Sequence, residues 1–258
     1  TLPYEMWSMD KIKPDTGILT SWMKEYLGDY VISGKLDGVS GLYTTEGDEP
    51  KLYTRGNGKV GQDVSHLIPK LRLPKNKDVV IRGEFIIKKD TFNTKYADKF
   101  ANPRNMVAGI INQKTQDDRI NDIDFVAYEV IKPANLTPVE QMEHMASLDV
   151  HVVHNETHKT ITNEILSGIL VDWRNNDDYE IDGIIVANDK VYSRVSGNPK
   201  HTFAFKMVLS DQIAEAHVVD VIWSPSKDGY LKPRVQIMPV KLGGVTIKYA
   251  TGFNAKFI

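Results

Sequence analysis

The amino-acid sequence predicts an α+β protein followed by a smaller all-β segment. Runs of β-branched and aromatic residues, typical of strands, dominate the first part of the chain, and amphipathic or capped helical segments interrupt them. After Met207 apolar residues alternate with polar ones between Gly and Pro turns, without a helical period. We therefore expect two domains, residues 1–209 and residues 210–258.

The expected helices have recognisable starts or ends. Apolar residues recur at helical spacing over residues 18–27, and Gly28 follows where a left-handed C-cap residue would sit. Three later helices should begin after a side chain that can accept a hydrogen bond from the first turn, and one of these starts has the Thr-Pro-x-Glu pattern of a capping box. The expected N-cap residues are Asn102, Thr137 and Thr162.

The expected strands are short and rich in β-branched or aromatic residues. In the first domain they span residues 30–32, 39–43, 79–87, 123–131, 181–187 and 202–208. In the second domain they span residues 219–223, 235–237 and 245–249.

Composition and charge narrow the classes of function. The chain has 258 residues, 41% of them hydrophobic and 26% charged, which is ordinary for a globular protein. Its net charge of −2 argues against a globally cationic nucleic-acid binder, so phosphate contacts would need a local patch. Residues 227–258 contain six basic residues and one acidic residue, Asp228. A solvated face would explain that excess as well as a binding surface would.

Two absences in the sequence exclude further classes. Cysteine does not occur, which excludes disulfides, thiol catalysis and cysteine-ligated zinc within these residues. No apolar run approaches the roughly 20 residues that cross a bilayer, and the first residues do not resemble a signal peptide. We expect a protein of the cytosol or nucleus with no membrane partner. We interpret His144, His151, His154 and His158 as solvated surface residues rather than as a metal site.

The tetrapeptide Lys35-Leu36-Asp37-Gly38 directly follows a predicted strand. It places a lysine and a carboxylate at a strand end, where the glycine lets the backbone approach a ligand. A nucleophilic lysine must lose its proton, so its pKa would have to fall from the usual value of about 10.4. By itself the tetrapeptide is also compatible with an exposed turn lysine.

Further segments follow in a characteristic order. They are TRGNGKVGQD from Thr54, RGEFIIKK from Arg82, FANPRNMVAG from Phe100, DGIIVA from Asp182 and FAFKM from Phe203. With MWSMDK and KLDG, this series resembles the nucleotidyltransferase domain of NAD-dependent DNA ligases over nearly the whole chain. The resemblance implies an ATP-grasp-like ligase domain of mixed antiparallel sheets with helices over residues 1–209. It also implies the N-terminal part of an OB-fold over residues 210–258.

The resemblance implies a DNA ligase core that uses NAD as the AMP donor together with Mg²⁺. Lys35 would attack the α-phosphorus of the nucleotide, nicotinamide mononucleotide would leave, and AMP would remain on the lysine. AMP would then pass to a 5′-phosphate of nicked double-stranded DNA, and the 3′-hydroxyl would seal the nick. This chemistry serves DNA replication and the repair of DNA damage, and we expect it in the cytoplasm in a bacterial, phage or viral setting.

The resemblance also assigns roles to residues at matching positions. The expected catalytic residues are Lys35, Asp37, Arg174 and Lys206. The expected nucleotide-binding residues are Ser33, Lys35, Arg55, Glu84, Tyr128 and Lys206, with Tyr128 stacking on adenine. Asp37 and Glu84 would hold magnesium. DNA would contact Arg104 and, in the basic patch of the second domain, Lys232, Arg234 and Lys248.

Four polar positions depart from the family pattern. Ser33 replaces a glutamate at the purine edge, and Ala187 replaces a lysine that reaches the nucleotide. Gln62 and Asn112 stand where a glutamate and an arginine are expected. We hypothesise that Ser33 and Ala187 changed together because the purine edge is read differently in this protein.

Other functions stay open at this point. The departures leave two alternatives open. One is a ligase of the same superfamily that uses ATP as the donor or RNA as the acceptor. The other is a catalytically silent module that only binds nucleic acid. The family's nicotinamide-gripping domain and its zinc-finger and helix-hairpin-helix domains are not among these residues. We expect missing domains or a second chain to supply nicotinamide binding and DNA clamping.

Overall fold

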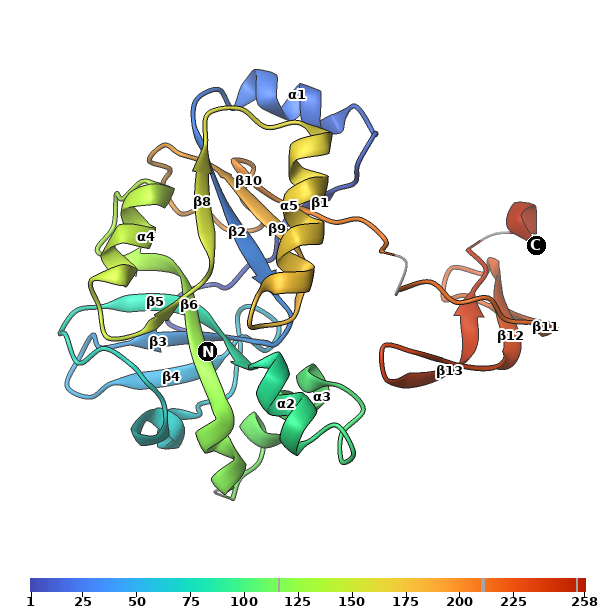
Figure 1. The fold of residues 1–258 in the computed structure, drawn as a ribbon, viewed down its shortest axis with the longest axis horizontal. Helices are drawn as coiled ribbons and strands as arrows, with labels where there is room; N and C mark the ends of the chain where they lie inside the picture. Colours follow the sequence, from blue (N-terminus) through green and yellow to red (C-terminus); the bar gives the residue numbers. More distant parts are fainter. Residues whose placement is uncertain (116, 210–211, 254) are drawn as a thin grey trace. The chain divides into compact units, whose positions relative to one another are not determined.

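The computed structural model describes residues 1–115, 117–209, 212–253 and 255–258 (Figure 1). The chain divides into two compact units, Thr1–Met207 and Val208–Ile258. Ser210, where the sequence analysis places the start of the second domain, lies outside the described residues. Within the described part of the chain, no helix is both long enough and apolar enough to cross a membrane.

The first unit contains two five-stranded sheets. The first sheet has the order β1-β10-β9-β2-β8, and only β1 and β10 pair in parallel. Its strands are β1 (Asp10–Ile12), β10 (Thr202–Phe205), β9 (Ile181–Asn188), β2 (Tyr30–Leu36) and β8 (Asn155–His158). The second sheet has the order β4-β3-β5-β6-β7, and only β6 and β7 pair in parallel. Its strands are β4 (Lys51–Thr54), β3 (Val39–Thr44), β5 (Val80–Ile87), β6 (Ile123–Lys132) and β7 (His151–Val152).

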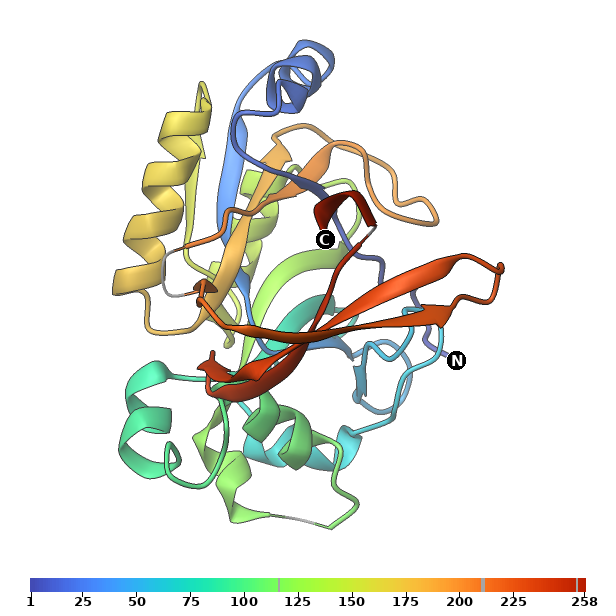
Figure 2. The same ribbon diagram turned by 90° about the vertical axis from the view of Figure 1, so that its right-hand side faces the viewer.

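Helices cover these sheets, so the predicted combination of mixed sheets and helices is confirmed. α5 packs on β9 of the first sheet, whereas α3 packs on β5 of the second sheet (Figures 1 and 2). The helices are α1 (Ile18–Glu25), α2 (Lys89–Lys95), α3 (Pro103–Ile111), α4 (Pro138–Ala146) and α5 (Asn163–Asn176). Short 3₁₀ helices span Ser65–Lys70 and Asp118–Asp122.

The predicted N-caps are confirmed. The side chain of Asn102 accepts a hydrogen bond from the backbone N–H of Asn105 at 2.8 Å, and Thr162 accepts one from Ile165 at 3.1 Å. Thr137 and Glu140 form both hydrogen bonds of a capping box. The predicted end of the first helix is wrong, because α1 ends at Glu25 with Tyr26 as its C-cap.

Alternation along β2 divides its side chains between two environments. Tyr30 and Ile32 lie in a core that α5 completes with Leu166, Leu170 and Trp173. Ser33 and Lys35 lie on the opposite face of the strand, which turns toward the second sheet. The second sheet has its own core around Phe85 and Phe125, whose rings meet edge to face at 5.2 Å. The first unit thus turns the face of β2 that carries Lys35 toward the second sheet and away from α5.

The strand predicted over residues 202–208 is too long. β10 ends at Phe205, and the backbone N–H of Lys206 then donates to the carbonyl of Ile12 at 3.2 Å. The strands β1, β4, β7 and β8 were not predicted. Each has at most four residues, which is too short for a period-2 pattern to be visible.

The second unit contains a three-stranded antiparallel sheet in the order β11-β12-β13. Its strands are β11 (Val218–Pro225), β12 (Leu231–Leu242) and β13 (Val245–Thr251), and a 3₁₀ turn follows at Ala255–Phe257. The register of β12 shifts against both neighbours, which marks β-bulges. Three strands do not by themselves establish a barrel, so the OB-fold stays a prediction.

The capping box of α4 gives a test of the local structure. Replacing Thr137 with Ala removes the side-chain oxygen that accepts from Glu140, so we expect the free energy of unfolding to fall by about 1 kcal/mol. Thr160 is exposed and makes no hydrogen bond to another described residue, so Thr160→Ala is the matched control. Urea unfolding of both variants measures the difference, and equal stability of the two would contradict the assigned cap.

Candidate active site

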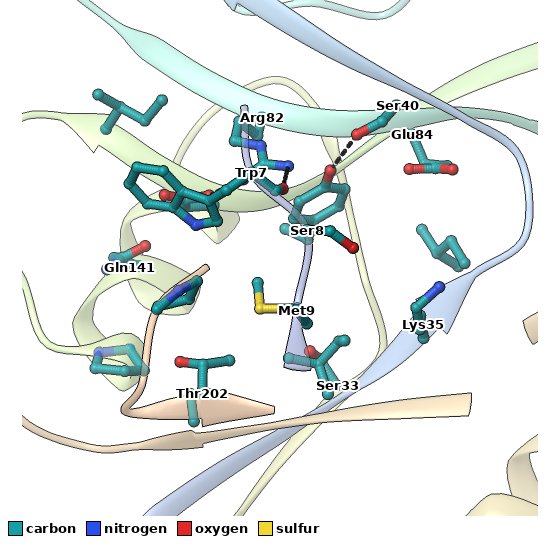
Figure 3. A pocket seen from close by; sticks show the side chains of 18 of the residues that line it. Trp7, Ser8, Met9, Ser33, Lys35, Ser40, Arg82, Glu84, Gln141 and Thr202 are labelled. Carbon is teal, nitrogen blue, oxygen red and sulfur yellow. Dashed lines mark hydrogen bonds and ion pairs between the residues drawn. The ribbon is translucent and has the colours of Figure 1, made fainter. Parts of the chain in front are cut away.

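A cavity of about 530 Å³ lies where the Lys35 face of β2 turns toward the second sheet. Side chains from both sheets and from residues 7–9 line it, and Figure 3 shows Lys35 and Glu84 pointing into one end of it. Ser33 and Thr202 lie farther along the first sheet (Figure 3). The cavity therefore joins a charged end to a polar, uncharged end.

Asp182 connects two lysines at the charged end. Lys35 lies opposite Gly183 in the pairing of β2 with β9, and its Nζ is 3.1 Å from Oδ1 of Asp182. Nζ of Lys206 is 3.1 Å from Oδ2 of the same carboxylate. All three side chains are partly exposed, between 24% and 29%. The sequence analysis gave Asp182 no role, although its motif was recognised.

Gly183 permits the close approach of Phe205 and Lys206 to β9. A Cβ atom at this position would lie 2.8 Å from the carbonyl oxygen of Phe205 and 3.0 Å from Cγ of Lys206. Any larger residue would therefore push the chain that carries Lys206 away from β9. The glycine after Asp182 is thus required by the close packing of β9 against the end of β10.

Glu84 is buried beside the turn that follows Lys35. Its Oε1 accepts a hydrogen bond from the backbone N–H of Gly38 at 3.2 Å. Burial raises the pKa of Glu84 to about 8, although the cationic Lys35 and Arg82 favour its ionised form. A Cβ on Gly38 would lie 2.2 Å from the carbonyl oxygen of Phe85, so only glycine fits here. Glu84 is therefore mostly protonated at neutral pH.

Asp37 and Arg104 form the outer rim of the charged end. Arg104, from the first turn of α3, donates to Asp37 Oδ1 at 3.2 Å, and its side chain is 61% exposed. Arg55 also lines the cavity, but its Nε donates to the carbonyl of Met6 at 3.0 Å. Both arginines are thus close enough to meet an anionic ligand.

Tyr128 lines the cavity from β6 on the second sheet. Its hydroxyl and Ser40 Oγ are 2.6 Å apart, and the dashed line in Figure 3 marks this hydrogen bond. The guanidinium carbon of Arg82 is 5.6 Å from the ring centroid. Burial raises the pKa of the Tyr128 hydroxyl, so the ring stays neutral.

Arg174 is not brought into the cavity. It forms an ion pair with Glu180 and donates to the carbonyl oxygen of Ile181 at 3.4 Å. It is absent from the cavity lining because it lies in the last turn of α5, on the helix-covered side of the first sheet. The catalytic role of Arg174 stays a prediction.

The N-terminal segment contributes residues that the sequence analysis missed. Trp7, Ser8 and Met9 line the cavity, and the Trp7 carbonyl accepts from Arg82 Nη2 at 3.0 Å. The guanidinium carbon of Arg194 is 3.9 Å from the centroid of the Trp7 ring. The MWSMDK motif was part of the resemblance, but nothing in one sequence indicates that it folds back over β6.

The four departures from the family pattern fall into two groups. Ser33 and Ala187 line the cavity, whereas Gln62 and Asn112 are exposed and lie outside its lining. Asn112 caps the C-terminus of α3 and donates to the carbonyl of Ala108 at 2.8 Å. The first group can therefore contact a ligand in the cavity directly.

The predicted basic patch of the second unit is divided between two faces. Lys232 and Arg234 are two residues apart on β12, so they point to the same face of the sheet. The Arg234 guanidinium carbon is 4.0 Å from the Tyr249 ring centroid. Lys248 precedes Tyr249 on β13 and therefore points to the opposite face. The period of the strands therefore places Lys248 on the other face from Lys232 and Arg234, and the DNA-binding role of all three residues stays a prediction.

The four clustered histidines are less solvated than predicted. His154 stacks on Trp173 with ring centroids 4.0 Å apart, and its Nδ1 lies 2.7 Å from Asp177 Oδ1. His158 pairs with Glu156 at 3.0 Å. Within the part of the chain that the structure describes, no group of three or more His, Asp or Glu side chains could hold a metal ion.

The buried carboxyl of Glu84 gives a test of the site's electrostatics. Because its pKa is raised from 4.5 to about 8 in the folded protein, folding favours the protonated form. This stabilisation is complete below pH 4.5 and is lost as the pH rises toward 8. We expect Glu84→Gln to become more stable than wild type over this window, by up to roughly 1.4 kcal/mol per pH unit. Denaturant unfolding across the window measures this, and a constant difference would contradict it.

Comparison with known proteins identifies the family. Residues 5–208 match the family described as "NAD-dependent DNA ligase adenylation domain". A DNA ligase of Acanthamoeba polyphaga mimivirus is 43% identical over 267 residues, covering 100% of this chain and 41% of that protein. A DNA ligase of Clostridioides difficile is 31% identical over 264 residues, covering 92% and 39%. The chain thus spans about two fifths of the length of these curated relatives.

Solved structures share the fold at low identity. A chain named Pmar-Lig_PreS3 aligns with a TM-score of 0.59 and 14% identity, covering 96% of this chain and 57% of that chain. An archaeal ATP-dependent RNA ligase aligns with a TM-score of 0.51 and 12% identity, covering 78% and 48%. These likenesses concern the fold alone. The family match over residues 5–208, together with the relatives, shows that this chain belongs to the family of NAD-dependent DNA ligase adenylation domains.

Proposed function

We propose that this chain is the adenylating core of an NAD-dependent DNA ligase, in which Lys35 carries AMP. The observation that carries the proposal is the pair of 3.1 Å contacts that Asp182 makes with Lys35 and Lys206 at the edge of the cavity. A lysine held at a strand end beside a carboxylate and a second cation can act as a nucleophile toward a phosphate.

The first step forms a bond between Lys35 Nζ and the α-phosphorus of NAD. The bond from that phosphorus to the bridging oxygen breaks, and nicotinamide mononucleotide leaves with the electron pair. Lys35 releases two protons in this step, one from its ammonium form before the attack and one as the phosphorus–nitrogen bond forms. Asp182, which accepts a hydrogen bond from Lys35 at 3.1 Å, can receive one of them, and solvent receives the other. The Lys206 cation, on the other oxygen of Asp182, stabilises the negative charge that builds up on the phosphate.

The remaining cavity residues fit the rest of the nucleotide. The neutral ring of Tyr128 offers a face on which adenine can stack. Arg55 supplies positive charge near the turn that carries Lys35, where the ribose and phosphate would lie. Ser33, on the same face of β2 as Lys35, reaches the base rather than the phosphate.

Magnesium fits this site with ligands supplied partly by the substrate. Asp37 and Glu84 flank the same turn, and Mg²⁺ commonly takes one or two carboxylates and completes its shell with phosphate oxygens and water. When bound, the ion would neutralise phosphate charge. Glu84 must lose its proton to serve as a ligand, and Asp37 must loosen its ion pair with Arg104.

The later steps concern DNA. We propose that AMP passes from Lys35 to the 5′-phosphate at a nick and that the 3′-hydroxyl then displaces AMP. Exposed Arg104 lies at the mouth of the cavity and suits a DNA phosphate. In the second unit, which we propose to be the opening of an OB-fold, Lys232 and Arg234 form the cationic face. Other domains or a second chain would grip nicotinamide and clamp the DNA.

The adenylation step is tested by weighing the intact chain after incubation with Mg²⁺ and either NAD or ATP, without DNA. We expect one added AMP from NAD, and none in Lys35→Ala because the nucleophile is gone. Lys77→Ala removes an exposed lysine outside the cavity and should keep the adduct. An adduct from ATP alone would favour an ATP-dependent ligase, and no adduct from either would favour a silent binding module.

The division of the basic patch is tested by nicked-DNA binding at several salt concentrations. Replacing Lys232 and Arg234 together with Ala should weaken binding and lower the slope of log K against log salt by roughly 0.9 for each lost phosphate contact. Lys248→Ala, on the opposite face of the sheet, should change the slope little. A larger effect of Lys248→Ala would show that DNA lies on the other face.

A further inference from the structure

Three strands of the first sheet place uncharged residues side by side at the inner end of the cavity. Ala187 on β9 pairs with Val31 on β2 and with Thr202 on β10, so the row runs Val31, Ala187, Thr202. Ser33 lies next to this row on β2, opposite Ile185. All five residues line the cavity. The two residues that depart from the family pattern at the nucleotide therefore share one surface.

Two buried residues present their hydroxyls to the cavity there. Ser33 is 6% exposed and Thr202 is 7% exposed, and in Figure 3 Ser33 lies between Lys35 and Thr202. Neither hydroxyl has a hydrogen-bond partner among the described residues. A buried hydroxyl without a partner is costly, so such groups usually meet a ligand or water. The site thus retains unused donors and acceptors.

The position of these hydroxyls suits a nucleobase. Ser33 and Lys35 are two residues apart on one strand and point the same way, so their Cα atoms are about 7 Å apart. A phosphate at Lys35 would place the ribose in the gap and the base against Ser33. The stacking face of Tyr128 lies across the cavity on the second sheet.

Arg194 is a cation that also lines the cavity, and most of its side chain is already engaged. It stacks on Trp7, pairs with Glu129 at 3.3 Å and donates to the Glu5 carbonyl at 2.9 Å, whereas its buried Nη2 has no hydrogen-bond partner among the described residues. Gln141 is engaged at both ends, because it accepts from the backbone of Val130 and donates to the carbonyl of Leu136. Ser33 and Thr202 are the two unpartnered hydroxyls that a base lying along the first sheet would meet.

We propose that Ser33 and Thr202 read the edge of the purine through their hydroxyls and that this site accepts 6-oxo purines nearly as well as adenine. The inference rests on the proposed function of the cavity. A glutamate and a lysine impose a fixed pattern of one acceptor and one donor, which matches the amino group and N1 of adenine. A hydroxyl can rotate and either donate or accept, so it also matches a carbonyl and an N–H.

The missing charges also explain why the two positions changed together. A glutamate alone at buried position 33 would lack the cation that a lysine at position 187 supplies, and a lysine alone at half-buried position 187 would lack the anion that a glutamate at position 33 supplies. When both residues are present, the charge of each neutralises the charge of the other. Ser33→Glu and Ala187→Lys should therefore each weaken nucleotide binding, and the double variant should recover it.

The test compares the dissociation constants of AMP and inosine 5′-monophosphate by titration calorimetry. For the wild-type chain we expect values within about threefold of each other. Ser33→Ala combined with Thr202→Val should weaken both nucleotides alike, whereas Thr160→Val, which changes an exposed threonine outside the cavity, should weaken neither. Ser33→Glu with Ala187→Lys should favour AMP by about tenfold or more. Thermal melting checks that each variant is folded.

The outcomes separate the inference from the function on which it rests. A wild-type preference for AMP of more than about tenfold would overturn the inference, as would unchanged binding when both hydroxyls are removed. If that preference occurs while Lys35 still accepts AMP from NAD, the proposed function stands without the inference. If neither nucleotide binds and no adduct forms, the proposed function itself fails.

Discussion

The carboxylate of Asp182 binds both lysines on which the proposed chemistry depends. Lys35 comes from β2 and Lys206 from the chain after β10, so neither lysine is near the other in sequence. β9 lies between these strands and presents one carboxylate to both amines at 3.1 Å. The shared anion offsets the repulsion between two cations in a partly desolvated place. Without Asp182, Lys35 would lose the ion pair that orients its side chain.

The sheets supply this arrangement through their two faces. One face of β2 packs in the core that α5 completes, and Ser33 and Lys35 on the other face line the cavity. Glycines allow the close approaches that the site needs, at Gly38 beside Phe85 and at Gly183 beside Lys206. The cavity therefore has charged side chains at the strand end, where a phosphate would react. It has uncharged hydroxyls farther along the sheet, where a base would lie.

The sequence predicted the local features well and the long-range contacts poorly. The N-caps Asn102, Thr137 and Thr162 are confirmed because capping depends on neighbours three residues away. The contact of Asp182 with Lys35 depends on a pairing between strands 147 residues apart, which no local pattern encodes. Arg174 matched its family position but pairs with Glu180 in the last turn of α5, and the short strands β1, β4, β7 and β8 showed no period-2 pattern. The position of Trp7 in the cavity lining could likewise not be predicted from the sequence.

The central claim is that Asp182 prepares Lys35 for attack, and Asp182→Asn tests it most directly. The amide keeps the size of the side chain but removes its charge and its capacity to take a proton. In single-turnover mixing with the nucleotide donor and Mg²⁺, we expect the rate of lysyl-AMP formation to fall by roughly 100-fold or more, with the AMP dissociation constant changed little. A variant that adenylates Lys35 at the wild-type rate would contradict the account.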